Sequence, residues 1–410
     1  MIISLPPTHF AEGYVTVDVL ARVFHVTVLD PVLTFLLVLY QLQRLTGLFT
    51  SKTALHALHK ASRIHWVRDV WTDRQMVAAL CVWGIGIAVV VNEQLSRAVR
   101  NNFRGQNEGW DKWQGQVVVI TGGAGGLGRE VIKQLNERKL GIKIAVMDAA
   151  AYPEPLPQNV SAYKVDIADP EAVKRTADSI RREVGPPSIL INMAGIVRAK
   201  SILDMEPKDI DLTYDVNVKS HFYTVQAFLP DMILRGIGHI ITIASSTGYV
   251  QAANGVAYCA SKAAAISFHE GLTEELRHVY LPASSARRIR TSVLCPAHIK
   301  TDMFAGFKMS LPKFFAPSLE VSTVGQLVVQ TALSGESQHI IEPLYSKFTP
   351  LARGLPTWIY SCVLVFVLVF PMSGSRRGSE LTVTFSTSRL ARRAMGGVRD
   401  VQKVKDEKAE

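Results

Sequence analysis

Three side chains in the middle of the chain have the types and the spacing to move a proton to or from an alcohol oxygen. Tyr258 and Lys262 stand four residues apart at the start of a long helical pattern, so their side chains share one helix face. An ammonium beside a phenol favours the phenolate and lowers the phenol pKa from about 10. Ser245 follows a predicted strand and can hydrogen-bond the substrate oxygen beside Tyr258. Any one of these residues alone would read as a surface or strand-end residue, but their order and spacing together predict an acid–base site.

A glycine-rich turn, TGGAGGLG at 121–128, lies upstream of these three residues. It falls between an apolar run typical of a strand (117–121) and a helical pattern (129–139). Glycine lets the backbone approach a pyrophosphate, and the N-terminus of the following helix offers N–H donors to it. The position between strand and helix therefore predicts dinucleotide binding. The predicted contact residues in this turn are Thr121, Gly122, Gly126, Leu127 and Gly128.

Polar and small residues that end the next three strands predict the rest of the cofactor site. Asp148 lies about 20 residues beyond the last glycine, where a carboxylate accepts from a ribose 2′-hydroxyl and repels a 2′-phosphate. No Arg or Lys lies in Gly122–Gly126, so NAD is favoured, and NADP stays open. The alternative is that Asp148 is an ordinary strand-end cap. We expect Asp166 to accept from the adenine amino group, and we expect the adenosine ribose to lie against Asn192, Ala194 and Gly195.

The elements that must position these residues alternate between apolar strands and helices. Such an alternation predicts an α/β fold with a doubly wound, seven-stranded parallel Rossmann sheet, filling about 115–345 as one domain. The predicted strands are 117–121, 143–148, 161–166, 188–192, 238–244, 289–295 and 338–342.

The charge of the chain is unevenly distributed. The formal net charge is +10, which would ordinarily suggest nucleic-acid binding, but the block 115–345 carries only +1. We therefore expect no nucleic-acid partner. The 48% share of hydrophobic residues excludes a disordered polyelectrolyte. The four cysteines are scattered and predict reduced thiols in a protein that faces the cytosol.

The flanks of the block hold three apolar runs, at 31–40, 75–91 and 357–372. The uncharged run 75–91 is at the short end of what spans a bilayer. One span plus one helix lying in the interface fits best, because the basic amphipathic segment 41–74 would otherwise face the lumen. The predicted organisation is a membrane-anchoring region 1–114 (apolar runs near 31–40 and 75–91), the catalytic domain 115–345, a membrane-associated apolar segment 346–372 and a basic, disordered tail 373–410.

A metal site is the competing reading of the histidines at positions 56, 59 and 65 in the basic segment. No Cys or carboxylate joins His56, His59 and His65 at ligand spacing, so we expect no metal.

With these motifs in place, residues 115–345 resemble a short-chain dehydrogenase/reductase. The TGxxxGxG motif of that family appears at 121–128, its NNAG at 192–195 with Met193 replacing an Asn, and its Asn within DVNVKS as Asn217. The resemblance implies that Tyr258 is the acid–base, that Lys262 binds the nicotinamide ribose and lowers the Tyr258 pKa, that Ser245 positions the carbonyl, and that Asn217 holds a water. The last implied cofactor contacts, after the sixth strand, are Pro296, where Ala297 replaces a glycine, and Thr301, for the carboxamide.

Within the family, the phrases FHEGLTEEL (268–276) and IIEPLYSKFTP (340–350) and the N-terminal anchor are similar to the membrane-bound retinol and 17-beta-hydroxysteroid dehydrogenase branch. That similarity implies hydrophobic alcohols and ketones as substrates. It also suggests an endoplasmic reticulum membrane with the catalytic domain facing the cytosol, or a lipid droplet. Apolar residues at 303–315 would either cover the cleft or seat the domain on lipid. A homodimer through 217–235 and 258–280 is the default expectation.

Two alternatives stay open at this point. One is a dehydrogenase of secondary metabolism that acts on a smaller polar ketone. The other is a non-catalytic lipid-surface protein that keeps the fold.

Overall fold

The computed structural model describes residues 16–46, 73–105, 110, 112–304, 314, 316–361, 373–377 and 380–384. The chain divides into two compact units. One comprises Val15–Gln106, and the other comprises Met1–Tyr14 together with Asn107–Glu410.

The larger unit is built on a seven-stranded sheet in the order β3-β2-β1-β4-β5-β6-β7, in which every pair of neighbours is parallel. The predicted doubly wound Rossmann sheet is confirmed, and the predicted strands differ from the observed ones only at their ends. The strands are β1 (Val117–Thr121), β2 (Lys143–Asp148), β3 (Val160–Lys164), β4 (Ile189–Asn192), β5 (His239–Ile243), β6 (Arg290–Pro296) and β7 (His339–Glu342).

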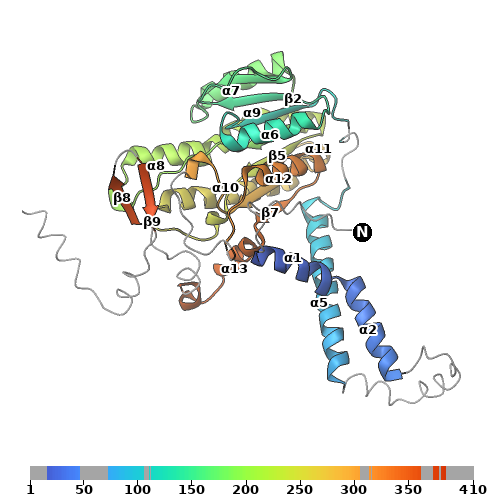
Figure 1. Ribbon diagram of the computed structural model, residues 1–410. Helices are drawn as coiled ribbons and strands as arrows, with labels where there is room; N and C mark the ends of the chain where they lie inside the picture. The colour runs from blue at the N-terminus through green and yellow to red at the C-terminus, as the bar shows by residue number, and fades with distance from the viewer. Residues whose placement is uncertain are drawn as a thin grey trace, which may run out of the picture. The chain divides into compact units, whose positions relative to one another are not determined.

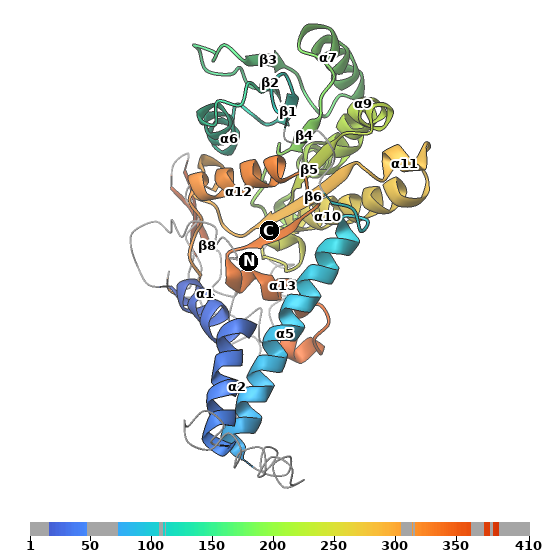
Figure 2. The ribbon, with the colours of Figure 1, turned by 90° about the vertical axis from the view of Figure 1, so that its right-hand side faces the viewer.

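Alternate residues of each central strand point into two separate cores, which explains why the strands are apolar throughout. On β1, Val117 and Val119 pack in one core, while Val118 and Ile120 pack in the other. Helices α7 (Pro170–Glu183), α9 (Ser220–Arg235) and α10 (Val256–His278) cover the first face, and α6 (Gly126–Glu137) and α12 (Val321–Ser334) cover the second. Figures 1 and 2 show the two layers of helices on either side of the sheet.

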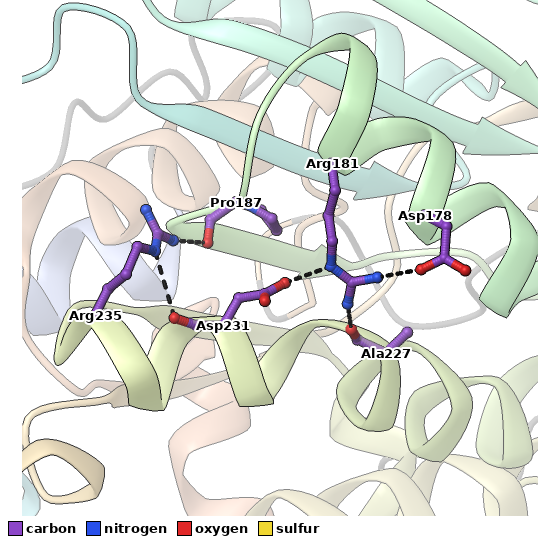
Figure 3. Close-up of polar contacts among 6 residues, drawn as sticks. All are labelled: Asp178, Arg181, Pro187, Ala227, Asp231 and Arg235. Atoms are coloured by element: carbon purple, nitrogen blue, oxygen red, sulfur yellow. Dashed lines mark hydrogen bonds and ion pairs between the residues drawn. The ribbon is translucent and has the colours of Figure 1, made fainter.

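Helices α7 and α9 are joined by an arginine that lies between them (Figure 3). Arg181 on α7 forms ion pairs with Asp178 on its own helix and with Asp231 on α9, both at 2.6 Å. Its remaining donor bonds the carbonyl of Ala227, and its guanidinium lies 5.9 Å from the Phe228 ring centre. A planar guanidinium with several partners is well suited to hold two helices in register.

Short helices fill most of the remaining connections. No helix forms between β2 and β3, where three prolines interrupt the connection. The short elements are η1 (Ile202–Asp204), α8 (Pro207–Tyr214), the π-helical turn η2 (Asp215–Lys219), η3 (Ser246–Gly248), α11 (Ala283–Ala286), η4 (Asp302–Phe304), η5 (Leu344–Phe348) and α13 (Thr349–Ala352).

The smaller unit consists of α1 (Val17–Val28), α2 (Pro31–Thr46) and α5 (Arg74–Arg100). Helices α2 and α5 lie side by side (Figures 1 and 2), with Val38, Met76 and Ala79 buried between them. Trp83 Nε1 donates to the carbonyl of Pro31 at 3.0 Å. Among the described residues, α5 is the one helix with the length and apolar composition to cross a membrane.

Several sequence predictions fall wholly or partly outside the described residues. Most of the basic segment 41–74 does, including its three histidines, as does 362–372 of the third apolar run. The described part of the chain holds no group of three or more potential metal ligands. In the tail, β8 (Ser373–Arg377) and β9 (Glu380–Thr384) pair antiparallel. Because an isolated two-stranded hairpin is at best marginally stable in water, the disordered tail stays a prediction.

The core predicts a large difference between two apolar truncations on α9. Phe228 is fully buried, so Phe228→Ala should lower the free energy of unfolding of the catalytic unit by about 3–5 kcal/mol. Leu234 is 84% exposed, so Leu234→Ala should change it by less than about 0.5 kcal/mol. Denaturant unfolding of the full chain in detergent measures both. Equal effects of the two substitutions would contradict the packing described here.

Candidate active site

A cleft of about 500 Å³ opens at the carboxyl ends of the strands. It lies where the strand order reverses between β1 and β4, the place where open α/β sheets bind ligands. Its walls are the glycine-rich turn, the residues that follow β2, β4, β5 and β6, and the first turns of α10.

The glycines at positions 122, 126 and 128 of the turn are needed for different physical reasons. Gly122 has φ +74°, and a Cβ there would lie 2.7 Å from Ala194 Cα at the end of β4. A Cβ on Gly128 would lie 2.4 Å from the Gly122 carbonyl oxygen. A Cβ on Gly126, in contrast, would meet no protein atom within 4 Å. The first two glycines are therefore required by the fold, while Gly126 borders open space at the N-terminus of α6, the position that a pyrophosphate needs.

Thr121 joins the ends of β1 and β4 beneath this turn. Its Oγ1 accepts from the backbone N–H groups of Met193 at 3.0 Å and Ala194 at 3.2 Å. The small residues after β4 are thus held against the turn, and Ala194 and Gly195 line the cleft.

The two predicted adenosine carboxylates both reach the cleft. Asp148 accepts from the backbone N–H groups of Ala124 and Ala150, each at 2.9 Å, so its carboxylate is fixed in direction. Asp166 is exposed and accepts from the Ala168 N–H at 2.9 Å. The exposed side chain of Arg129 lines the same end of the cleft.

The three residues of the predicted acid–base site come together at the other end of the cleft. Tyr258 and Lys262 are buried on successive turns of α10, and the Lys262 Nζ lies 5.9 Å from the Tyr258 ring centre. Lys262 Nζ donates to the carbonyl of Ile243, the last residue of β5, at 2.9 Å. Ser245 follows two residues later, and its Oγ donates to the Pro296 carbonyl at 3.3 Å.

Burial is the dominant influence on the protonation of this site. It raises the pKa of Tyr258 above its usual value, while a hydrogen bond with Ser245 acts in the opposite direction. Burial also lowers the pKa of Lys262 to about 8. The Lys262 ammonium bonds to the Ile243 carbonyl, and loss of hydration has the largest effect on the Tyr258 pKa, so the expected lowering of that pKa beside a bound nicotinamide stays a prediction.

Asn217 lies behind these residues, in the π-helical turn η2. Its Oδ1 accepts from the Ile196 N–H at 2.8 Å, and its Nδ2 donates to the Ile196 carbonyl at 3.0 Å and to Ser261 Oγ at 3.0 Å. A π-turn displaces one backbone bond from the helical ladder and is frequent at functional sites.

Not every predicted residue touches the cleft. Thr121, Asn192 and Asn217 are buried behind its wall. Asn192 Oδ1 accepts from Thr224 Oγ1 at 2.9 Å, so its side chain braces β4 against α9. All other predicted site residues line the cleft.

The substrate end of the cleft follows β6. Pro296 and Thr301 line it, and the Phe304 ring lies edge-on to Tyr258 at 6.3 Å. Most of the predicted apolar cover, 305–313 and 315, lies outside the described residues.

Sequence reasoning missed two side chains that hold the site. Thr247 donates from its backbone N at 3.2 Å and from Oγ1 at 2.9 Å to Ser245 Oγ. Ser261 accepts from Asn217 and donates to the Tyr258 carbonyl at 2.7 Å. Thr247 could have been recognised from its place two residues after Ser245, the spacing of a serine turn, whereas the partners of Ser261 are a backbone carbonyl and a residue 44 positions away.

Comparison with known proteins agrees with this arrangement. The family model described as short chain dehydrogenase matches residues 116–310. The dehydrogenase RED2 of Cochliobolus heterostrophus is 39% identical over 220 residues, covering 53% of this chain and 80% of that protein.

Human relatives and a solved structure extend the comparison. Epidermal retinol dehydrogenase 2 is 36% identical over 258 residues and 17-beta-hydroxysteroid dehydrogenase 13 is 32% identical over 248, each alignment covering 59% of this chain and 80% of the relative. The crystal structure of a short chain dehydrogenase from Burkholderia cenocepacia, in complex with NADP, has a TM-score of 0.51 at 24% identity and covers 62% of this chain and 99% of that one. At this identity the solved structure shows the fold alone.

The glycine-rich turn predicts opposite outcomes for two matched substitutions. Gly126→Ala should leave thermal unfolding unchanged but weaken dinucleotide binding, because its methyl group enters only the space along the turn. Gly128→Ala should lower the melting temperature, because backbone atoms of Gly122 and Gly123 occupy the space. Differential scanning fluorimetry with and without NADH measures both effects. Unfolding that is equally perturbed in the two variants would contradict this division of roles.

Proposed function

Because this chain belongs to the short-chain dehydrogenase family and is an NAD(P)-dependent alcohol dehydrogenase or ketoreductase, we propose that it interconverts a hydrophobic alcohol and its ketone or aldehyde at a membrane surface. The single observation that carries the proposal is the convergence of Ser245, Tyr258 and Lys262 at one end of a cleft whose other end has the glycine turn and Asp148. The bound nicotinamide would supply or accept the hydride.

In the proposed mechanism Tyr258 handles the proton of the substrate. Its hydroxyl donates a proton to the carbonyl oxygen during reduction and becomes a phenolate, and the phenolate accepts the proton of the alcohol during oxidation. Ser245, which lines the same end of the cleft as Tyr258, positions the same substrate oxygen. The raised pKa of Tyr258 suits the acid role, and any cation that approaches the phenol favours the base role.

Lys262 and Asn217 are proposed to assist this proton transfer without contacting the substrate oxygen. With its pKa lowered to about 8, Lys262 can exchange a proton near neutral pH, and we propose that it also donates to the nicotinamide ribose. Asn217 ties η2 to Ile196 and to α10 through Ser261, and we propose that the π-turn there holds a water for proton exchange.

The cofactor contacts favour NAD. The Asp148 carboxylate, held by two backbone donors, would accept from the adenosine ribose and repel a 2′-phosphate. The remaining proposed contacts are Gly122, Gly126, Leu127, Gly128, Asp166, Ala194, Gly195, Pro296 and Thr301, with Thr121 and Asn192 bracing them.

A lipophilic substrate is supported by the apolar lining beside Tyr258, which includes Ile196, Met303 and Phe304. Two relatives, a retinol dehydrogenase and a hydroxysteroid dehydrogenase by name, point to substrates of this class. A homodimer through α9 and α10 remains part of the proposal.

Membrane attachment is proposed through residues 1–114. Helix α5 has the length and composition to cross a bilayer, and α2 is a shorter apolar helix. We propose the endoplasmic reticulum, with the catalytic domain facing the cytosol, or a lipid droplet, and we propose that 346–372 is also membrane-associated.

The acid–base assignment predicts the effect of removing one oxygen atom. Tyr258→Phe should lower kcat for lipophilic alcohols by about 10²–10⁴-fold while NADH binding is kept, because only the proton donor is lost. Tyr280→Phe, on a tyrosine bonded to Glu275 outside the cleft, is the matched control and should keep full activity. Turnover of retinol and steroid alcohols by the full chain in detergent measures both. Equal rates for wild type and Tyr258→Phe would refute the assignment.

The cofactor assignment predicts a change in selectivity. Asp148→Asn should raise the ratio of kcat/KM for NADP over NAD by at least about tenfold, or about 1.4 kcal/mol, because the repulsive charge is removed beside Arg129. Asp166→Asn removes a charge from the same end and should leave that ratio unchanged. A wild-type enzyme that already prefers NADP would show that Asp148 has another role.

A further inference from the structure

The segment Leu344–Ser361, which follows β7, presents large apolar side chains to solvent. Phe348 is 67% exposed, Leu351 66% and Trp358 71%. Ser346 and Ala352 in the same segment are buried, so one side of it is seated in the domain while the other carries the apolar groups. The exposed apolar side chains therefore lie on the outer side of a segment whose inner side packs against the catalytic unit.

The sequence around this surface favours a lipid bilayer as its occupant. No acidic residue occurs between Glu342 and Glu380, and Lys347 and Arg353 add positive charge. The apolar run of 357–372 continues directly from the surface. Exposed Trp beside basic residues and aliphatic side chains is typical of segments that lie in a membrane interface.

The same segment also reaches the catalytic residues through Arg353. Its Nε donates to the Tyr249 carbonyl and its Nη2 donates to the Gly248 carbonyl, each at 2.9 Å. These carbonyls lie at the end of η3, the turn that begins directly after Ser245. A rigid guanidinium fork on two adjacent carbonyls fixes that turn in two directions.

The turn that Arg353 holds is in contact with both ends of the acid–base site. Thr247 within it donates twice to Ser245 Oγ. Gly248 packs so closely on α10 that a Cβ there would lie 2.9 Å from the Lys262 carbonyl oxygen. A shift of the turn would therefore change the position of Ser245 relative to Tyr258 and Lys262.

We propose that the surface formed by Phe348, Leu351 and Trp358 docks on a lipid bilayer, and that Arg353 transmits this docking to the η3 turn. Arg353 is thus a positioning residue for Ser245, and the enzyme is most active when the segment lies on lipid. The inference rests on the proposed membrane association of 346–372, and it adds a link from that association to catalysis.

The docking is tested by fluorescence quenching with the full chain reconstituted in phosphatidylcholine vesicles whose acyl chains carry bromine. The emission that is lost in Trp358→Phe should be quenched by brominated lipid and not by the unbrominated lipid. Trp113, at the end of the predicted anchoring region but packed edge-on against Trp110 in the core of the larger unit, is the control, and the emission lost in Trp113→Phe should not be quenched. An unquenched Trp358, whether exposed to water or covered by a second copy of the chain, would overturn the docking.

The link to catalysis is tested by steady-state kinetics in the same vesicles. Arg353→Gln should lower kcat by between about tenfold and 10²-fold with KM for the cofactor unchanged, because the substrate oxygen is misplaced while the cofactor end is intact. Arg353→Lys, which can keep one of the two bonds, should recover part of kcat. Arg182→Gln removes an exposed guanidinium on α7 whose one hydrogen bond among the described residues is to Ser179, and as the matched control it should keep wild-type kcat. Wild-type kcat in Arg353→Gln would overturn the link.

A double-mutant cycle connects the two tests. If docking acts through Arg353, Trp358→Ser should lower kcat in wild type but not in Arg353→Gln. Additive effects would show that the two residues act separately and would overturn the proposed transmission. The quenching experiment requires no turnover, so it judges the docking even if the substrate class is wrong. An active, anchored enzyme that is indifferent to Arg353 would reject this inference and leave the proposed function standing.

Discussion

The close approach of β1 and β4 at their carboxyl ends is the constraint on which the rest of the site depends. Ala194 lies so near Gly122 that a side chain on Gly122 would overlap it, and Thr121 accepts two N–H groups from the start of the β4 connection. The chain leaves β1 toward α6 on one face of the sheet and leaves β4 toward the other face. The cleft exists because these two connections separate directly above two strands that are held in contact.

The two ends of the cleft differ in their chemistry because one end is open to solvent and the other is buried. The end near Asp148 is open, and its charge is directed by backbone donors. The end near Tyr258 is buried, so loss of hydration favours the neutral phenol and the neutral amine at once. A pair poised in this way responds strongly to one nearby charge or hydrogen bond, because such interactions are stronger where water is excluded. The protonation of Tyr258 should therefore depend strongly on the position of Ser245. The η3 turn, which holds Ser245, would then influence the chemistry as well as the packing.

The distribution of charge and apolar surface fits a neutral catalytic unit with basic, apolar flanks. The block 115–345 is nearly neutral, so the +10 of the chain resides almost entirely outside it. In the sequence, the exposed apolar side chains Phe348, Leu351 and Trp358 follow that block, and α2 and α5 precede it. Excess positive charge and exposed apolar side chains are thus concentrated in the segments for which lipid contact is proposed. The stability of the sheet domain does not require them.

The sequence by itself determined the seven strands, their parallel arrangement and most of the cleft wall, because each strand is a short apolar run and the ligand-facing residues sit at strand ends or at i, i+4 on one helix. It did not determine the balance at Tyr258, since burial depends on what α10 packs against rather than on its neighbours in the chain. It also named Thr121, Asn192 and Asn217 as site residues, and only the packing shows that these three side chains are buried and do not line the cleft. Thr247, Ser261 and Arg353 were absent from the sequence argument for the same reason. Ser261 and Arg353 bond to backbone atoms or to segments as far as 105 residues away, and Thr247 reaches Ser245 Oγ through the η3 turn, so only the folded chain brings these groups together.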